Sequence, residues 1–374
     1  MTTRKCAHYI STYLPITEVW IYNQIKNLRQ FQPIIFSRYI ANKELFPIDP
    51  IISLRSQGSL SFKLNIIMSK LIGYIPYFKK ISKKENIRLI HVHFGYHGIK
   101  FIGLKKTLNI PLVCSFYGHD AYRYPTLKKK NLKKLKKLFN NAEAILVLGE
   151  TMKKHLISLG CPPSKLIIHH LGIETNKISF SERKIPTSKI RFLMTSSFVE
   201  KKGIDITLKA LAKVKDLFDF EVHIIGDGKL REPIKKLIST LDLDQRITLH
   251  GYQNYQTILD FAYKSDVFLQ ASRTAKDNDK EGTPMVFADM MATGLPIIST
   301  KHSDIPEMIE DGINGYLAQE NDVDSFANKI VEYYKNRTKV PQMSKNCRLK
   351  VEADFCATEQ AHKLDKLYTK VIDQ

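Results

Sequence analysis

The sequence predicts an α/β protein with two doubly wound, Rossmann-like domains that face a central cleft. Short apolar runs alternate with amphipathic helical patterns along the whole chain, as in parallel sheets covered by helices. The chain has 374 residues, which is too long for one compact core and suits two domains. The polar stretch Glu174–Lys189 lacks clear periodicity and contains Pro186, so we expect it to be the linker.

We therefore expect an N-terminal domain over residues 1–180, a C-terminal domain over 181–350, and a helical tail over 351–374 that packs back towards the N-terminal domain. The apolar runs predict strands at Lys5–Ser11, Pro33–Ile40, Leu89–Gly95, Pro111–Gly118, Ala142–Gly149, Leu166–Leu171, Ile190–Ser196, Glu221–Gly226, Arg246–Gly251, Asp266–Ala271 and Leu295–Thr300. The helical patterns fall at Glu18–Arg29, Glu150–Leu159, Ile204–Lys215, Leu230–Leu241, Tyr255–Tyr263, Pro284–Thr293 and Asp324–Asn336.

Composition narrows the class of protein and of partner. Hydrophobic residues are 43% and charged residues 25%, as in globular proteins. A formal net charge of +21 implies an anionic partner, such as nucleic acid, an anionic membrane face or a phosphorylated ligand. The five cysteines form no CxxC pair, which argues against a disulfide framework or a zinc site and favours the cytoplasm. We expect neither a signal peptide nor a transmembrane helix.

The most apolar long segment is Leu60–Phe78, interrupted by Lys63 and Lys70. Its large apolar residues recur at helical spacing: Leu60, Leu64, Ile67, Leu71, Ile75 and Phe78. An ordinary helix packed on the N-terminal core is one interpretation. A helix lying in a membrane interface is the other.

The stretch Glu281–Asp289 is the strongest functional signal. A predicted strand ends at Ala271, a polar loop follows, and Thr283 and Pro284 suit the N-cap and first turn of a helix. The start of a helix offers unpaired N–H groups and a positive dipole end, which suit a phosphate or a sugar hydroxyl. From spacing alone, Glu281 and Asp289 could equally be solvated acids.

This stretch resembles the E-x7-E signature of family 4 retaining glycosyltransferases, which have the GT-B fold. In their bacterial surface-polysaccharide subgroup, this region contains an acidic loop, then EGxP, an acid and AxGxPV. The corresponding residues in this sequence are Asp277 and Asp279, then Glu281-Gly282-Thr283-Pro284, Asp289 and Ala292-Thr-Gly-Leu-Pro-Ile. The resemblance implies that Glu281 is catalytic and contacts the transferred sugar, with Gly282, Thr283 and Pro284 beside the donor. It implies that Asp289, one methylene shorter than the usual glutamate, binds the ribose.

Three further segments resemble the family in the expected order. Ser196–Gly203 is similar to G-R-x-x-x-x-K-G. The similarity implies that Lys202 binds the donor diphosphate. Ser197 stands where the family has arginine. Leu249-His-Gly251-Tyr252 is similar to the segment whose backbone reads the base. Lys301–Glu307 is similar to H-x-G-I-P-E. Asp277-Asn-Asp279 also reads as the D-x-D metal motif of another glycosyltransferase fold, but we expect no metal or cofactor.

The N-terminal half resembles the family more weakly. Pro15–Trp20 is similar to S-E-T-F, which places Thr17 and Glu18 on the acceptor side. Ser115–Asp120 is similar to F-x-G-x-D, so His119 and Asp120 are candidate catalytic residues, with turn chemistry as the alternative.

Two histidines alternate along a predicted strand in His91-Val-His93-Phe-Gly95, which is similar to H-x-H-F-G. They could suggest a metal pair. No acid or cysteine partner has ligand spacing, however, so we interpret them as structural.

Residues Lys128–Lys137 hold seven lysines in ten positions. A stripe of Leu127, Leu132, Leu135 and Leu138 makes the segment a basic amphipathic helix. It could be a solvated face, but the overall charge favours contact with an anionic membrane that carries a lipid-linked acceptor. Nucleic acid is disfavoured because no aromatics interleave the lysines.

The resemblance implies a retaining, metal-independent hexosyltransferase. It would use a UDP- or GDP-sugar and a lipid-linked glycan acceptor on the inner face of the cytoplasmic membrane. A nucleotide-sugar epimerase of the same fold and a non-catalytic sugar- or lipid-binding module are the alternatives. The motifs identify neither the base, the sugar nor the acceptor.

Overall fold

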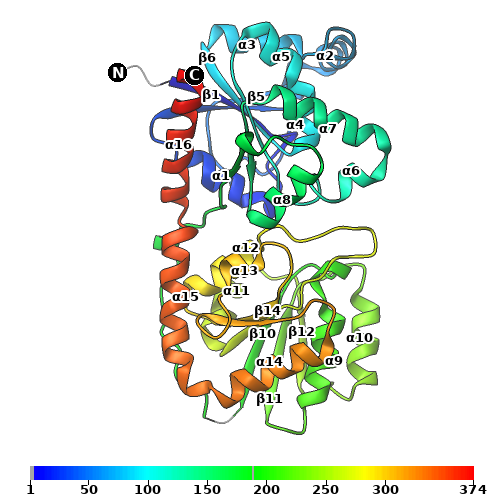
Figure 1. The fold of residues 1–374 in the computed structure, drawn as a ribbon, viewed down its shortest axis with the longest axis vertical. Coiled ribbons are helices and arrows are strands. Elements are labelled where there is room, and N and C mark those ends of the chain that lie inside the picture. Colours follow the sequence, from blue (N-terminus) through cyan, green and yellow to red (C-terminus); the bar gives the residue numbers. More distant parts are fainter. Residues whose placement is uncertain (1–3, 188) are drawn as a thin grey trace. The chain divides into compact units, whose positions relative to one another are not determined.

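The computed structural model describes residues 4–187 and 189–374, so residues 1–3 and residue 188 of the expected linker lie outside it. The chain forms two α/β units (Figure 1). Unit 1 contains the residues up to Gly172 together with Ala357–Gln374, and unit 2 contains Ile173–Cys356. The sequence placed these boundaries at residues 180 and 351.

A parallel sheet of seven strands forms the centre of unit 1, in the order β5-β3-β1-β6-β7-β8-β9. Its strands are β1 (Arg4–Tyr9), β3 (Phe31–Ser37), β5 (Ile51–Ser53), β6 (Ile87–His93), β7 (Leu112–Ser115), β8 (Ala144–Val147) and β9 (Leu166–Ile168). A small sheet pairs β2 (Thr12–Tyr13) with β4 (Tyr39–Ile40). Strand order reverses between β1 and β6, the switch point at whose carboxyl ends open α/β sheets bind ligands.

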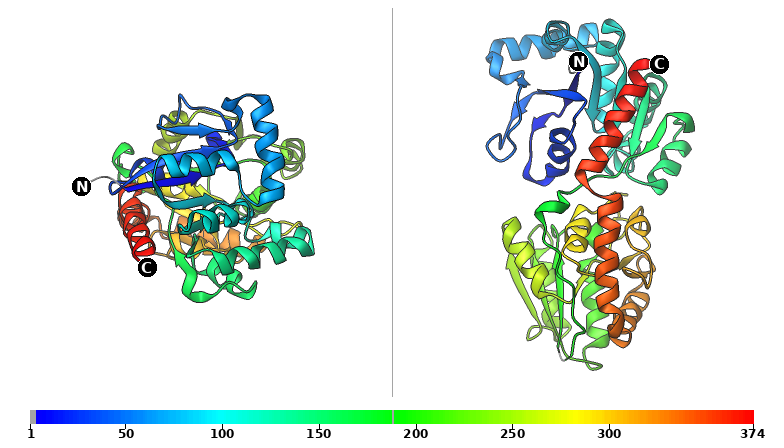
Figure 2. Two further views of the ribbon diagram at one scale, coloured as in Figure 1. Left: turned by 90° about the horizontal axis from the view of Figure 1, so that it is seen from above. Right: turned by 90° about the vertical axis from the view of Figure 1, so that its left-hand side faces the viewer.

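Helices cover this sheet (Figures 1 and 2). They are α1 (Val19–Lys26), α2 (Ser59–Ile72), α3 (Pro76–Lys84), α4 (Gly95–Gly98), α5 (Ile102–Leu108), α6 (Arg123–Leu127), α7 (Lys129–Asn141), α8 (Glu150–Ser158) and α16 (Ala357–Asp373). Although α16 ends the chain, its Leu364 and Tyr368 share a buried cluster with Phe31 and Leu89. The Asp365 carboxylate of α16 also accepts two backbone N–H bonds from the turn after α1.

Unit 2 has a parallel sheet of six strands in the order β12-β11-β10-β13-β14-β15. The strands are β10 (Ile190–Thr195), β11 (Phe220–Ile225), β12 (Ile247–Gly251), β13 (Val267–Leu269), β14 (Ile297–Thr300) and β15 (Gly315–Ala318). The helices are α9 (Ile204–Val214), α10 (Arg231–Thr240), α11 (Tyr255–Lys264), α12 (Met285–Ala292), α13 (Ile305–Met308), α14 (Val323–Lys335) and α15 (Val340–Asp354). The switch point lies between β10 and β13.

Both faces of this sheet are buried, which explains why its strands read as continuous apolar runs. Successive side chains of β10 point to opposite faces: Phe192 and Met194 join one core cluster, and Leu193 joins the other. Helices α9, α10 and α14 contribute to the first cluster, and α11, α12 and α15 to the second. The sheet is thus held between two helical layers, with its strand ends free to form a site.

Several local expectations were wrong. The predicted helix over Leu60–Phe78 is two helices, because Gly73 adopts a left-handed conformation (φ 80°) after α2 and Pro76 begins α3. Strands β5 and β15 were not predicted. Leu127 is exposed at the end of α6, so it does not extend the apolar stripe of α7.

The expected linker is not a free connection. Arg183 is 5% exposed, and its guanidinium donates to the backbone oxygens of Ser181, Thr293 and Ala262. This part of the expected linker therefore packs on unit 2. Helix α12 also starts later than predicted: Pro284 is its N-cap, and Thr283 makes no capping bond.

Candidate functional site

An ion pair of low exposure lies at the carboxyl edge of the unit 2 sheet. The Lys202 ammonium is 2.9 Å from a Glu281 carboxylate oxygen, with side chains 14% and 8% exposed. Lys202 comes from the loop after β10, and Glu281 from the loop after β13, the two strands that flank the switch point. The fold therefore brings together two residues that the sequence assigned to the donor, at the edge where ligands of doubly wound sheets bind.

A second lysine reinforces this site. Lys201 lies 3.2 Å from the Asp279 carboxylate. Burial alone would raise the pKa of Glu281, but the charges of Lys202 and Lys201 outweigh it and hold that pKa below its usual range. Glu281 is therefore an ionised carboxylate at neutral pH, and two cations face the loop that carries it.

His302 and Glu320 brace the backbone of Glu281. The Glu281 N–H donates to His302 Nε2 at 3.2 Å, so that nitrogen carries no proton. The proton must then lie on Nδ1, which is 2.8 Å from a Glu320 carboxylate oxygen and donates to it. Glu320 also accepts from the Thr274 N–H. This chain of contacts fixes the loop that precedes Glu281.

Two glycines let the loops approach closely. A Cβ on Gly203 would lie 1.7 Å from the Ala271 carbonyl oxygen, and Gly203 has φ 60°. A Cβ on Gly226 would lie 1.9 Å from the Ser196 oxygen, at φ 133°. A larger residue at Gly203 would push the Lys202 loop away from the end of β13, and one at Gly226 would push the start of that loop away from the end of β11, so both positions require glycine.

Asp289 lies on α12 and is half-buried. The Tyr255 hydroxyl donates to its carboxylate at 2.9 Å. Burial raises the pKa of Asp289 to about 7, although the Tyr255 bond opposes the rise. Asp289 consequently changes charge near neutral pH, which the sequence pattern did not suggest.

The remaining expected donor residues occupy the same strand ends. Ser197 is exposed just after β10, and Gly251 ends β12 with φ 67°. Tyr252 is 73% exposed, and its hydroxyl donates to the backbone carbonyl oxygen of Asp227. Gly282 and Pro284 are buried beside Glu281. The Thr283 hydroxyl is buried without a hydrogen-bond partner among the described residues.

In unit 1, Asp120 is fully buried and occupied by backbone. One carboxylate oxygen accepts from the Gly95 N–H at 2.7 Å, and the other from Tyr117 and Gly118 at 2.9 and 3.1 Å. These bonds tie the loop after β7 to the start of α4. They support turn chemistry as the role of Asp120, the alternative to direct catalysis.

The other acceptor-side candidates lie near the carboxyl edge of the unit 1 sheet. His119 is exposed, and its ring lies edge-on to Tyr96 with centroids 6.3 Å apart. Thr17 and Glu18 form the short helix η1 (Ile16–Glu18), where Thr17 is exposed and Glu18 half-buried. Burial raises the pKa of Glu18 to about 7. Glu18 can therefore exchange a proton near neutral pH, and the exposed ring of His119 is open to contact with a ligand.

The buried histidines form a closed hydrogen-bond network. His8 Nδ1 is 3.1 Å from His93 Nε2, and His91 bonds Tyr368 and Ser115. Burial lowers the pKa of all three histidines, that of His8 to about 3. They are the one group of three metal-ligand side chains found among the described residues. Since the His91 and His93 nitrogens are already bonded, the network supports the structural interpretation.

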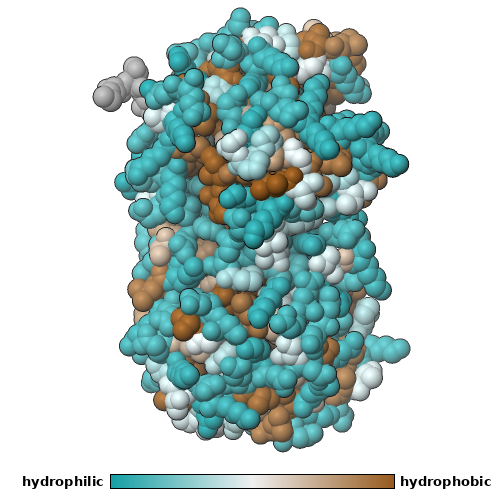
Figure 3. Space-filling view, in the orientation of Figure 1, coloured by the Kyte–Doolittle hydropathy of each residue, from teal (hydrophilic) through white to brown (hydrophobic). Residues whose placement is uncertain are grey.

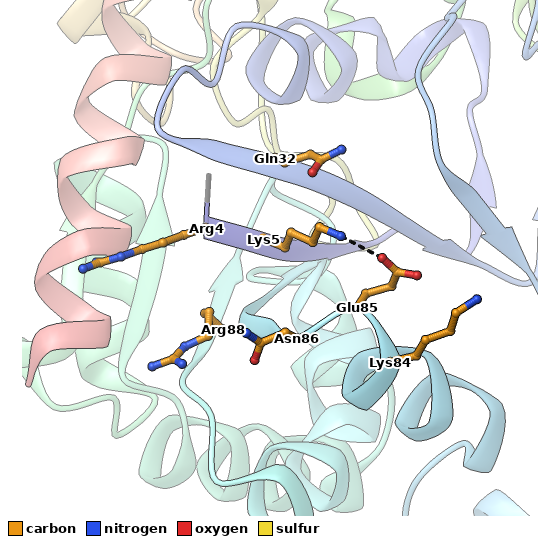
Figure 4. Close-up of a pocket in the computed structure, with 7 residues that line it drawn as sticks. All are labelled: Arg4, Lys5, Gln32, Lys84, Glu85, Asn86 and Arg88. Carbon is orange, nitrogen blue, oxygen red and sulfur yellow. Dashed lines mark hydrogen bonds and ion pairs between the residues drawn. The ribbon is translucent and has the colours of Figure 1, made fainter. Parts of the chain in front are cut away.

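A hollow of about 650 Å³ in unit 1 is lined by Arg4, Lys5, Gln32, Lys84, Glu85, Asn86 and Arg88 (Figure 4). Arg4 and Lys5 begin β1, so the hollow lies at the amino edge of the sheet, opposite the edge that binds ligands. Lys5 is also neutralised by Glu85 at 2.8 Å. We therefore do not assign the donor to this hollow.

Sequence reasoning missed four residues of the site. Lys201 stands beside the predicted lysine, and His302 lies in the Lys301–Glu307 motif, so both had a signal that was not used. Glu320 and Tyr255 had none, because only the fold brings them to His302 and Asp289.

Comparison with known proteins identifies the family. A family model described as Glycosyltransferase Family 4 matches residues 18–177, and one described as Glycosyl transferases group 1 matches residues 175–350. The uncharacterized glycosyltransferase MJ1178 of Methanocaldococcus jannaschii is 30% identical over 72% of this chain and 72% of its own length. The chain belongs to glycosyltransferase family 4.

Other relatives carry more specific names. The amylovoran biosynthesis glycosyltransferase AmsK of Erwinia amylovora is 33% identical over 71% of this chain, and the match spans 65% of AmsK. The UDP-Gal:alpha-D-GlcNAc-diphosphoundecaprenol alpha-1,3-galactosyltransferase of Escherichia coli is 24% identical over 82% of each chain.

Solved structures show the same fold. Anabaena Alr3699/HepE in complex with UDP superposes with a TM-score of 0.80 over 98% of this chain and all of its own, at 15% identity. The fold is thus GT-B, with two Rossmann-like domains. Within the described residues, no helix is both long and apolar enough to cross a bilayer.

Proposed function

We propose that this family member transfers a hexose-type sugar, with retention of anomeric configuration, from a UDP- or GDP-sugar to a growing lipid-linked glycan. The observation that carries the proposal is the Lys202–Glu281 pair at the switch point of unit 2. A lysine of low exposure in contact with a buried carboxylate can serve a donor whose diphosphate is anionic and whose sugar offers hydroxyl groups.

The donor diphosphate would compete with Glu281 for Lys202. When phosphate oxygens accept from Lys202, the Glu281 carboxylate is released to accept from a sugar hydroxyl. Lys201 remains nearby, held by Asp279, and adds positive charge as the leaving diphosphate develops negative charge. The protein thus supplies positioning and charge stabilisation.

Asp289 is assigned to the ribose hydroxyls, which its carboxylate can accept as hydrogen bonds. Ser197, Gly251 and Tyr252 are assigned to the nucleotide, since they lie at the neighbouring strand ends. In unit 1, Thr17, Glu18 and His119 are assigned to the acceptor. Asp120 is assigned to positioning, because backbone N–H groups occupy both of its oxygens.

We propose that transfer needs no metal. The Asp279 side chain of the D-x-D sequence is paired with Lys201, and the lysines can neutralise the diphosphate. Transfer that persists undiminished in EDTA supports this; transfer that stops in EDTA and returns with Mg²⁺ or Mn²⁺ contradicts it.

The proposed acceptor and place of action rest on relatives. AmsK acts in amylovoran biosynthesis, and the E. coli relative is named for a diphosphoundecaprenol acceptor. We propose a peripheral position on the inner face of the cytoplasmic membrane, where the seven exposed lysines of Lys128–Lys137 contact anionic lipid.

The test uses purified protein, a panel of UDP- and GDP-hexoses and a lipid extract containing glycan acceptors. Sugar incorporation into lipid supports the proposal. Isomerised nucleotide sugar without acceptor would instead show an epimerase. Nucleotide binding with no transfer to any extract would show a non-catalytic module.

A further inference from the structure

Helix α2 (Ser59–Ile72) turns its apolar side chains away from the protein. Its large apolar residues are mostly exposed: Leu60 71%, Leu64 51%, Ile67 55%, Met68 43%, Leu71 79% and Ile72 42%. None of its residues is fully buried. Figure 3 shows the resulting hydrophobic surface at the position of α2, at the upper right of the molecule. Single exposed leucines are ordinary, but a cluster of this kind marks a binding surface.

The opposite side of α2 is the better buried one and is mixed in polarity, because Phe62 and Ile66 are half-buried there beside polar residues. Ser61, Asn65 and Ser69 recur every four residues and are half-buried. The Asn65 side-chain oxygen accepts from the Tyr77 N–H at 2.9 Å, which ties α2 to α3. Six of the eight large apolar side chains of α2 are therefore exposed, whereas a surface helix usually turns its apolar face towards the core.

The segment around α2 carries charge of one sign. Between Pro50 and Lys84 there are seven basic residues and no acid. Two of them, Lys63 and Lys70, are seven residues apart and flank one edge of the apolar stripe. Apolar side chains bordered by lysines suit the interface of an anionic bilayer, where the stripe enters the acyl boundary and the ammonium groups meet lipid phosphates.

We propose that α2 inserts its apolar face into an anionic lipid bilayer and anchors unit 1 to it. This inference rests on the proposed function, because a lipid-linked acceptor is presented at such a surface. It adds a hydrophobic contact to the electrostatic one proposed for Lys128–Lys137. A second copy of the chain fits less well: pairing two α2 faces would bring together lysines of both copies, with no acid in the segment to compensate.

The test is cosedimentation of the full chain with vesicles of equal parts phosphatidylcholine and phosphatidylglycerol, and with phosphatidylcholine alone. Leu64→Ser combined with Leu71→Ser should lower partitioning onto anionic vesicles by at least about tenfold, because two inserted leucines are lost. Lys63→Gln combined with Lys70→Gln should lower it by about fivefold per lysine. Both leucines are more than half exposed, so the fold should be unaffected.

The matched control is Leu217→Ser combined with Leu349→Ser, which are 61% and 62% exposed in unit 2 and should leave partitioning unchanged. Equal partitioning of wild type and the Leu64/Leu71 variant overturns the proposal. So does a dimer in lipid-free sedimentation that this variant dissociates, because α2 would then bind a second copy.

UDP and GDP binding, measured by calorimetry without lipid, separates the two proposals. Retained nucleotide binding with no vesicle binding overturns only the role of α2. Loss of vesicle binding in the Leu64/Leu71 variant with unchanged nucleotide binding is the result we expect. A wild type that partitions onto vesicles but binds no nucleotide would instead contradict the proposed function.

Discussion

Replacing Glu281 with glutamine should separate donor binding from sugar transfer. The change keeps the shape of the side chain but removes the charge that faces Lys202 at 2.9 Å. A charge-assisted hydrogen bond contributes about 1.5–3 kcal/mol, equivalent to about 10- to 150-fold in a rate or binding constant. If Glu281 contacts the sugar, transfer should fall by at least about tenfold.

Nucleotide binding should behave differently. In the variant the Lys202 ammonium no longer faces an ionised carboxylate, so a diphosphate does not have to displace one. The dissociation constant for the nucleoside diphosphate should stay the same or decrease, because the variant removes the repulsion between the Glu281 carboxylate and the diphosphate. Solvent screens this repulsion little, since the pair has low exposure. Calorimetry measures this constant, and incorporation of labelled sugar into lipid measures transfer.

Glu232→Gln is the matched control, because Glu232 is an exposed glutamate of α10 paired with Lys235. It should change neither quantity. Equal loss of nucleotide binding and transfer in the Glu281 variant would refute the reasoning, because Glu281 would then hold the site together rather than contact the sugar.

Three other predictions follow from the same structure. Lys202→Ala should weaken nucleoside diphosphate binding by at least about tenfold in calorimetry; near wild-type binding would remove Lys202 from the site. Donor affinity should fall as pH drops below about 7, because Asp289 becomes protonated. Tyr255→Phe should move the midpoint of this pH dependence upward, because it removes a hydrogen-bond donor to the carboxylate. A midpoint that stays fixed in the variant contradicts the assignment of Asp289. Finally, the depressed pKa values of His8, His91 and His93 favour their neutral forms in the folded state. Their contribution to stability is complete above about pH 6.5 and is lost progressively as pH falls below it, for His8 down to about pH 3, by up to about 1.4 kcal/mol per pH unit for each histidine. Thermal unfolding should therefore shift downward below pH 6.5, and a flat profile between pH 6.5 and 5 would contradict it.

Much of the fold could be predicted from sequence because buried parallel strands and amphipathic helices leave a clear periodic pattern. The missed strand β5 is only three residues long, and β15 follows a turn rather than a clear helical pattern. The helix predicted over Leu60–Phe78 failed because its spacing continues through Gly73 and Pro76, where the backbone turns. Periodicity also shows which residues share a helix face, but not which way the face points, as α2 illustrates.

The site was predictable where one short segment carries the chemistry. Glu281 and Lys202 stand in local motifs, and the fold brings them into contact. Residues that act through distant partners could not be found this way: Glu320 reaches Glu281 only through His302, and Tyr255 reaches Asp289 from another helix. For Asp120, the sequence could not show that backbone N–H groups occupy its carboxylate.

The most direct test of the central claim is the anomeric configuration of the transferred sugar. Purified protein is incubated in EDTA with the UDP- or GDP-hexose that it binds and with a lipid-linked glycan acceptor, and the product linkage is determined by NMR. The account predicts a sugar attached with the same anomeric configuration as in the donor. An inverted linkage, or isomerised donor with no product, would contradict it.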